Sequence, residues 1–392
     1  MPGAGRALLA HSGGPTAVIN ASLLGVVEEA RQQPDFRAVY GARFGIDGIL
    51  NGDFVDLLAQ SEATLLGVAN SPSSALGSSR REVTEADLAR VLEVLRAHDV
   101  RYFFYNGGNG SMGTALHIAE MARHSGYELH VVGIPKTIDN DVMETDHTPG
   151  YASTARFFAS AVREIGADNR SLPGQVEIVE VLGRNAGWIV AATMLARAEP
   201  DDAPHLIYLP EQPLPLARLL ADVERVFRRL SRCVVVVCEG QLDERGEPFG
   251  ADVRAGSRGT LAMNLGHRLA LLVTQHLGTK ARSEKPGLLG RASQAMRSQV
   301  DWDEARLCGQ AAVRAAARGL SGTMVTLVRQ PGPAYSAGTD LCPLERVAFI
   351  ERLFPAEWRT AEGNDVSPAF REYIMPLVIP LAAHRSLDPA IP

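Results

Sequence analysis

The residues with the most chemistry-bearing side chains lie in the segment PKTIDND, residues 135–141. Lys136 stands three residues before Asp139, and Asp141 follows two residues after it. Such a set can supply a proton acceptor, a carboxylate that orients a metal or a substrate, and a cation beside a transferring anionic group. The structural alternative for this segment is an Asx-rich turn with a solvated lysine.

Two glycine-rich segments, SGGPT at 12–16 and GGNGSMG at 107–113, stand between an expected strand and an expected helix. Glycine lets backbone N–H groups approach a phosphate closely, although such turns also occur for structural reasons alone. The second segment contains Gly-x-Gly-x-x-Gly and so opens a nicotinamide-dependent dehydrogenase interpretation. The next expected strand, however, ends in Pro135-Lys136 and not in the acid that holds a ribose. A phosphate loop explains these glycines better.

Arginines near such turns form the complementary half of a phosphate site. Guanidinium groups bind phosphate through paired N–H bonds. Arginines follow or bracket glycine-containing segments at Arg80, Arg81, Arg184, Arg282 and Arg291. A single arginine is more often a surface charge, so it is their coincidence with glycine turns that indicates a phosphorylated ligand.

The elements that must position these groups repeat one order: a short apolar run, a glycine or proline turn, and then a helical period. Strands are expected at 6–10, 102–105, 129–134, 176–182, 205–209 and 233–238, and helices at 85–98 and 304–318. This order predicts an α/β fold with mostly parallel sheets sandwiched by helices. The polar segments would then share the carboxyl edge of a sheet, where such folds bind ligands.

Length and composition exclude several classes of protein. The chain has 392 residues, which predicts two or three domains, and its net charge of -6 argues against a nucleic-acid partner. Its four cysteines include no Cys-x-x-Cys pair that would indicate zinc or redox chemistry. Residues 1–10 are too short for a signal segment and no run of about 18 apolar residues occurs, so we expect a cytoplasmic protein without a membrane partner.

Taken together, SGGPTAVINAS, GGNGSM, PKTIDND, EVLGRNAGW and RSEKPGLLGR resemble the phosphofructokinase family from residue 6 to about residue 330. The resemblance implies phosphoryl transfer to the C1 hydroxyl of fructose 6-phosphate in glycolysis, with Mg²⁺ as cofactor. It also implies two similar α/β domains with the site between them. Residues 1–140 with about 255–305 would bind the donor, about 141–254 with 306–335 the sugar phosphate, and 336–392 would be a C-terminal extension.

The resemblance also implies roles for single residues. Asp139 resembles the base that accepts the hydroxyl proton, with Lys136 and Arg80 beside the transferring phosphate. Donor contacts are implied for Gly14, Arg80, Gly108, Asn109, Gly110 and Ser111, with Asn109 nearest the metal. Sugar contacts are implied for Thr137, Asp139, Asp141, Leu182, Gly183, Arg184, Glu239, Arg282 and Arg291. Because some arginines of this family reach the neighbouring subunit, a homodimer or homotetramer is expected.

Two positions favour different phosphoryl donors. Lys136 resembles the pyrophosphate-dependent branch, since many ATP-dependent members have glycine there. Gly110 stands where pyrophosphate users typically carry an aspartate that excludes the α-phosphate of ATP. A lysine can swing aside, whereas a missing carboxylate blocks nothing, so we expect ATP, with pyrophosphate as the alternative.

Three departures from the family pattern bear on metal and sugar binding. Asn109 replaces an aspartate and removes one negative charge near the metal. Leu288 stands where a histidine or tyrosine usually contacts the sugar, and Gln175 stands where many members have a cross-subunit arginine. Either the affinity for the sugar is weaker, or another cation such as Arg297 or Arg170 substitutes. These departures leave a non-catalytic sugar-phosphate sensor as a further alternative.

Overall fold

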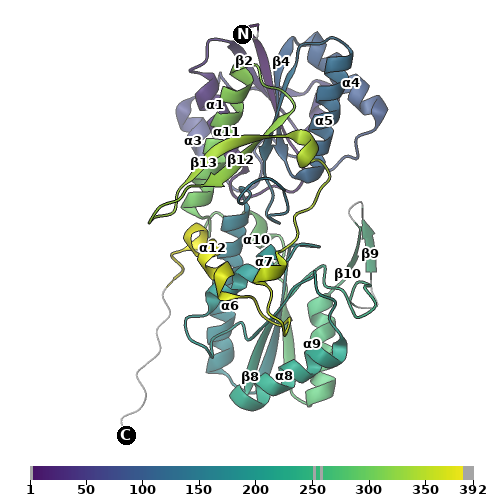
Figure 1. Ribbon diagram of the computed structural model, residues 1–392, viewed down its shortest axis with the longest axis vertical. Helices are drawn as coiled ribbons and strands as arrows, with labels where there is room; N and C mark the ends of the chain where they lie inside the picture. Colours follow the sequence, from purple (N-terminus) through teal and green to yellow (C-terminus); the bar gives the residue numbers. More distant parts are fainter. Residues whose placement is uncertain (1–2, 250–252, 257–258, 383–392) are drawn as a thin grey trace.

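The computed structural model describes residues 3–249, 253–256 and 259–382. Two lobes lie one above the other along the long axis, and each is built around one β-sheet (Figure 1). Buried apolar clusters fill both faces of both sheets, beneath covering helices. The predicted α/β class and its helix-sandwiched, mostly parallel sheets are therefore confirmed.

The sheet of the first lobe has seven strands in the order β13-β12-β5-β4-β1-β2-β3. The central strands are parallel, and the edge strands β3 and β13 are antiparallel to their neighbours. Their near-continuous apolar runs follow from burial on both faces. The strands are β1 Gly5–His11, β2 Phe36–Ala42, β3 Phe54–Asp56, β4 Val100–Gly107, β5 His130–Pro135, β12 Thr323–Arg329 and β13 Ala337–Pro343.

Helices cover both faces of this sheet. On one face pack α1 (Ile19–Ala30), α3 (Glu62–Ala69) and α11 (Gln299–Ala317), and on the other α2 (Ile46–Asn51), α4 (Glu85–Ala97) and α5 (Asn109–His124). Helix α4 matches the expected helix because Thr84 and Asp87 form a capping box. Helix α11 begins five residues before the expected 304, because Ser298 caps it by accepting a bond from the backbone N–H of Asp301.

The second lobe has a four-stranded parallel sheet in the order β11-β6-β8-β7. Helices α6, α7 and α12 cover one face, and α8 and α9 cover the other. Its strands are β6 Gln175–Val181, β7 Leu206–Tyr208, β8 Arg232–Cys238 and β11 Lys280–Glu284, with a separate hairpin of β9 Val253–Gly256 and β10 Gly259–Ala262. Its helices are α6 Tyr151–Ser171, α7 Trp188–Ala192, α8 Leu216–Leu230, α9 Leu265–Leu277, α10 Leu289–Ala292 and α12 Pro368–Val378.

Two chain segments lie in the opposite lobe from the one expected. Strand β11 belongs to the second sheet, although 255–305 was expected with the first lobe. Strand β12 and helix α11 belong to the first lobe, although 306–335 was expected with the second. The cause is tertiary: α11 packs so closely on α1 that a methyl group on Gly25 would lie 2.0 Å from the carbonyl oxygen of Arg306. Which lobe binds which substrate stays a prediction.

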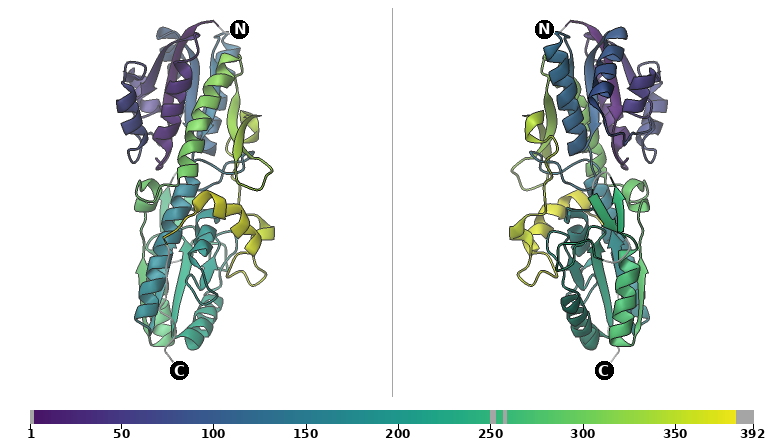
Figure 2. Two further views of the ribbon diagram at one scale, coloured as in Figure 1. Left: turned by 90° about the vertical axis from the view of Figure 1, so that its left-hand side faces the viewer. Right: turned by 90° about the vertical axis from the view of Figure 1, so that its right-hand side faces the viewer.

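The segment after β13 runs from the first lobe to the second and wraps across both (Figures 1 and 2). It contains the 3₁₀ turns Leu344–Arg346 and Ala356–Trp358, and then α12. Phe354 and Trp358 pack on Trp188, with ring centroids 5.2 and 5.8 Å away. This segment, which we name the wrapping extension (344–382), is therefore bound into the core of the second lobe. Across the described ranges, no helix is long and apolar enough to cross a bilayer.

Candidate functional site

Three of the sequence-predicted segments meet at one edge of the first sheet. Neighbouring strands β1, β4 and β5 end in register, with His11 opposite Asn106 and Gly107 opposite Pro135. The turn at 12–14, the start of α5 and the PKTIDND loop follow these strand ends directly. The expected placement at a carboxyl edge is therefore confirmed.

Two arginines face the turn at residues 12–14, which we call the glycine turn. A methyl group on Gly14 would lie 3.3 Å from Nη1 of Arg291 and 3.5 Å from Nη2 of Arg80. Arg291 was expected among the sugar contacts, yet α10 brings its guanidinium group to the first lobe. Two guanidinium forks at one glycine turn form an arrangement suited to phosphate oxygens.

Lys136 lies directly behind the glycine turn and is fixed there. Its Nζ donates to the carbonyl oxygens of Ser12, at 2.6 Å, and Gly14, at 2.8 Å. The side chain is only 2% exposed, so it does not swing aside as the sequence argument supposed. Burial, together with the nearby Lys136, lowers the pKa of the adjacent His11 to about 3. The side-chain nitrogen of Lys136 thus lies against the back of the glycine turn.

The first turn of α5 presents its backbone N–H groups to the same edge. A methyl group on Gly108 would lie 3.8 Å from Cβ of Thr137, so the α5 turn and the PKTIDND loop are in close contact. Ser111 is buried beside Gly107. Gly110, by contrast, borders open space, because nothing lies within 4 Å of its Cβ position.

Asn109 contacts the carboxylate loop. Its Nδ2 donates to Oδ2 of Asp141 at 3.3 Å, and its Oδ1 accepts from the backbone N–H of Gly110 at 2.7 Å. Within the described residues, no three His, Cys, Asp or Glu side chains form a cluster that would enclose a metal. Mg²⁺ typically takes one or two carboxylates together with waters and substrate phosphates. Asp139 and Asp141 fit that mode of binding, with Asn109 orienting Asp141.

The second lobe contributes two loops from neighbouring strands. Leu182, Gly183 and Arg184 follow β6, Glu239 follows β8, and the last residues of these strands are in register. Gly183 has φ +130° and a methyl group there would lie 2.8 Å from the carbonyl oxygen of Ala186, so this turn requires glycine. Sγ of Cys238 donates to the carbonyl oxygen of Arg184 at 3.3 Å and ties the two loops together.

Asp139 belongs to the loop after β5 and lies near Glu239 of the second lobe. It is half-buried, and its backbone N–H donates to Oγ1 of Thr137 at 3.1 Å. Burial raises the pKa of Glu239, and the nearby Asp139 carboxylate raises it further, while Arg184 and Lys285 act in the opposite sense. The predicted base, Asp139, therefore lies within electrostatic reach of the predicted sugar loops.

Arg282 lies on an edge strand, away from the carboxyl ends of the strands that carry these loops. It is exposed on edge strand β11, in register with Glu177. The carboxyl end of β6 lies four residues beyond Glu177, or about 13 Å along the strand. Leu288 is 64% exposed near Arg291.

The two cations considered as substitutes for Gln175 are engaged elsewhere. Arg170 lies in the last turn of α6, away from the site, and donates to Asp202. Nη1 of Arg297 donates to Oδ1 of Asn70 at 2.7 Å. Their substitution for a sugar-binding arginine stays a prediction.

The sequence interpretation missed a contribution from the wrapping extension. Nη1 of Arg352 donates to the carbonyl oxygen of Asp146 at 3.0 Å, and the hydroxyl of Tyr373 donates to the same oxygen at 2.8 Å. Both bonds hold the loop that carries Asp139. No local pattern marks either residue, because their partners are backbone carbonyls far away in the sequence.

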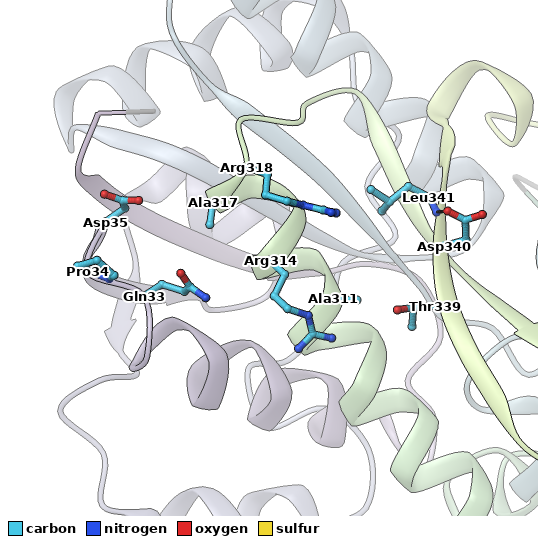
Figure 3. A pocket seen from close by; sticks show the side chains of 10 residues that line it. All are labelled: Gln33, Pro34, Asp35, Ala311, Arg314, Ala317, Arg318, Thr339, Asp340 and Leu341. Carbon is cyan, nitrogen blue, oxygen red and sulfur yellow. Dashed lines mark hydrogen bonds between the residues drawn. The ribbon is translucent and has the colours of Figure 1, made fainter. Parts of the chain in front are cut away.

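A pocket of about 680 Å³ lies on the first lobe, away from the predicted site residues (Figure 3). It is bordered by the loop between α1 and β2, the C-terminal half of α11 and strand β13, and it contains Asp35, Arg318 and Asp340. Its other arginine, Arg314, donates to Oε2 of Glu29 at 2.7 Å. With acids and bases mixed and no glycine turn, it lacks the converging cations of the site described above.

A parallel α/β sheet whose glycine turn faces converging cations beside a carboxylate loop defines a phosphate-binding α/β protein. The phosphofructokinase family model matches residues 6–316, and the chain belongs to this family. The family predicted from the motifs is confirmed.

Named relatives make the comparison more specific. The chain is 40% identical over 383 residues to the pyrophosphate--fructose 6-phosphate 1-phosphotransferase of Rhodospirillum rubrum, covering 95% of this chain and 94% of that protein. The crystal structure of the pyrophosphate-dependent phosphofructokinase from Nitrosospira multiformis matches with a TM-score of 0.89 and 34% identity, over 98% of this chain and 94% of that one. An ATP-dependent 6-phosphofructokinase of Amycolatopsis methanolica is 30% identical over 264 residues, covering 64% of this chain and 56% of that protein.

Proposed function

We propose that this protein is a pyrophosphate-dependent fructose 6-phosphate 1-phosphotransferase. The relatives that match nearly the whole chain carry that name, whereas the ATP-dependent relative matches a shorter part at lower identity. The comparisons thus favour the alternative donor over ATP, which the sequence argument had preferred.

The observation that carries this choice is the fixed position of Lys136. The preference for ATP depended on a lysine that could move away and on the space left by Gly110. Lys136 is instead held by two carbonyl oxygens behind the glycine turn. Pyrophosphate concentrates its charge on two phosphates, so a lysine held in place beside two arginines suits it well. The open space at Gly110 excludes neither donor, so the choice of donor does not depend on it.

In the direction of bisphosphate formation, the C1 hydroxyl oxygen of the sugar attacks one phosphorus of pyrophosphate. Asp139 accepts the hydroxyl proton, the new C1–O–P bond forms, and the bridging P–O bond breaks so that orthophosphate leaves. Lys136, Arg80 and Arg291 stabilise the negative charge spread over the transferring group. Mg²⁺, when bound by the carboxylate loop and the donor phosphates, would neutralise further donor charge.

The sugar phosphate would occupy the second-lobe loops. Arg184 supplies a guanidinium group, Glu239 a carboxylate for sugar hydroxyls, and Leu182 with Gly183 the apolar and backbone walls. Arg282 faces outward from an edge strand, so we propose that it acts in a homo-oligomer, on the site of a neighbouring subunit. Thr137 and Asp141 complete the junction between sugar and donor.

The test is a coupled assay for fructose 1,6-bisphosphate, run with Mg²⁺ and with pyrophosphate or ATP as donor. We expect turnover with pyrophosphate, turnover at least 100-fold slower with ATP, and loss of both on chelation of the metal. Faster turnover with ATP would reverse the choice of donor. Binding of fructose 6-phosphate without product from either donor would support the sensor alternative.

A further inference from the structure

Arg352 of the wrapping extension binds the backbone of the loop that follows Asp139. Its Nε and Nη2 donate to the carbonyl oxygen of Asn140 at 3.1 and 2.9 Å. Its Nη1 donates to the carbonyl oxygen of Asp146 at 3.0 Å and also to that of Thr145. One planar side chain therefore donates to carbonyl oxygens at residue 140 and at residues 145–146, which lie at the two ends of this loop.

The backbone around Arg352 adds to the same loop. The N–H of Arg352 donates to the carbonyl oxygen of Asp141 at 2.8 Å, and Glu351 forms an antiparallel bridge with Val142. The extension thus pairs with the loop as a short strand would. Each contact orders backbone whose fluctuation would otherwise displace the neighbouring Asp139 side chain.

Arg352 also contacts the loop that follows β6 in the second lobe. This loop carries Arg184, and we call it the sugar loop. Its guanidinium carbon lies 4.7 Å from the centroid of the Trp188 ring, and Nε1 of Trp188 donates to the carbonyl oxygen of Arg352 at 3.1 Å. Oε2 of Glu351 accepts from Nδ2 of Asn185 at 3.2 Å. Asn185 and Trp188 follow Arg184 in the segment GRNAGW, so the extension links the base loop to the sugar loop.

The loop needs such support because its backbone is not in a relaxed conformation. Asn140, next to Asp139, has φ +55°, a left-handed value that is uncommon for residues other than glycine. Its Oδ1 accepts from the N–H of Thr148 at 2.9 Å, and its Nδ2 donates to the Tyr373 hydroxyl at 3.3 Å. Arg352 and Tyr373 therefore bind both the backbone and the side chain of the strained residue.

We propose that Arg352 is a positioning residue, which holds the Asp139 loop in register with the sugar loop, and that Tyr373 assists it. The proposal deepens the proposed function and rests on it, since it concerns the geometry of the predicted base. Arginine suits this position because a planar fork can donate to several carbonyls while it stacks on an indole ring. A lysine ammonium lacks that geometry.

The first test compares Arg352→Ala and Arg352→Lys with Arg359→Ala in the full-length protein with pyrophosphate as donor. Arg359 is a matched control, because its Nε donates at 3.1 Å to the carbonyl oxygen of Phe354, within the extension itself. We expect kcat to fall about 50-fold in Arg352→Ala and about 10-fold in Arg352→Lys, with each KM within about threefold. Arg359→Ala should keep kcat within about twofold.

Chemical rescue separates positioning from a loss of stability. Guanidinium chloride at millimolar concentration should restore part of the kcat of Arg352→Ala, whereas equal sodium chloride should not. A kcat within twofold of the Arg359→Ala control, or a lowered melting temperature with normal turnover per folded molecule, would overturn the proposal.

A second variant decides the matter if Arg352→Ala does not fold. Tyr373→Phe removes only the hydroxyl that bonds to Asn140 and Asp146, and we expect kcat to fall about fivefold. Unchanged kcat in both Tyr373→Phe and Arg352→Lys would contradict the proposal. A wild-type protein that makes no fructose 1,6-bisphosphate would instead refute the proposed function, a result distinct from either of these.

Discussion

The proposed phosphate side and the proposed sugar side of the site are built differently. On the phosphate side, one chain supplies a glycine turn, a buried lysine and two arginines within 4 Å of Gly14 or its neighbours. On the sugar side, the same chain offers Arg184 and Glu239 at the strand ends, while Arg282 faces outward from the edge strand. The cations of the first half converge within one subunit, whereas Arg282, which is predicted for the second half, faces outward.

The difference suits two separate roles, stabilisation of charge on the transferring phosphate and binding of the sugar phosphate. Groups that bear on the charge of the transferring phosphate must be fixed, because electrostatic stabilisation depends on preorganised charges. If Arg282 acts on a neighbouring subunit, as we propose, binding of the sugar phosphate is coupled to assembly. Asp139 lies where the two halves meet, and it depends on both.

The largest effect is expected from Asp139→Asn, which removes the proton acceptor at this junction. We expect kcat with pyrophosphate to fall about 10³-fold, with both KM values nearly unchanged, since the loss of a general base acts on the chemical step. Steady-state kinetics measure both quantities. Asp303→Asn, on the exposed side of α11, is the control, and near-normal turnover of folded Asp139→Asn would contradict the mechanism.

The sugar side is tested by Arg282→Ala. We expect KM for fructose 6-phosphate to rise about 10-fold while KM for pyrophosphate stays constant, because only the sugar phosphate loses a guanidinium contact. Co-expression of Arg282→Ala with Asp139→Asn should then yield mixed oligomers that are more active than Asp139→Asn alone and that retain some sites of normal KM. A single population of sites with raised KM would place Arg282 on its own chain's site, and an unchanged KM would exclude it from the site.

The phosphate side is tested by a matched pair of glycine variants. Gly14→Ala places a methyl group 3.3 Å from Arg291 and 3.5 Å from Arg80, so we expect KM for pyrophosphate to rise about fivefold as the guanidinium groups move. Gly110→Ala projects into open space, and its KM for pyrophosphate should change less than twofold. Equal effects in both variants would show that the glycine turn is no closer to the donor than Gly110.

The smallest effect concerns a buried contact between the loop that follows Asp139 and helix α11. Nδ1 of His147 lies 2.8 Å from Oδ2 of Asp146, and its Nε2 lies 2.6 Å from Oε2 of Glu304 on α11. Burial favours the neutral ring, but the two carboxylates outweigh it and raise the pKa of His147 to about 9.

Since this folded-state pKa lies above the unfolded value, the stabilisation is complete below about pH 6.5 and is lost as the pH rises through about 9. Thermal unfolding between pH 7 and pH 9.5 should show a fall in melting temperature on the order of 5 °C beyond that of His147→Gln. Parallel pH profiles for the two proteins would mean that His147 is not charged in the folded state.

Local sequence signals predicted the motif loops and the strands β1, β4, β5, β6, β7 and β8, but not β2, β3 or the later strands β9 to β13. Apolar runs such as that of β4, followed by glycine turns, determine strands through short-range chemistry, and parallel topology then brings their ends together. The interchange of β11 and β12 between lobes could not be predicted, because it depends on which sheet edge is available. The sequence also did not predict that Lys136 is held by two carbonyl oxygens or that Arg352 binds the loop after Asp139. The partners in both cases are backbone carbonyl groups, which every residue possesses.

The path of the wrapping extension has a consequence for how the protein is made. A ribosome completes the loop around Asn140 long before it adds Arg352, on the order of ten seconds or more at ordinary rates of synthesis. During that interval the nascent chain carries most of its motif residues without the late segment that braces them. Truncation before Arg352 would therefore leave a chain that keeps all its signature sequences yet lacks the contacts that we propose position its base.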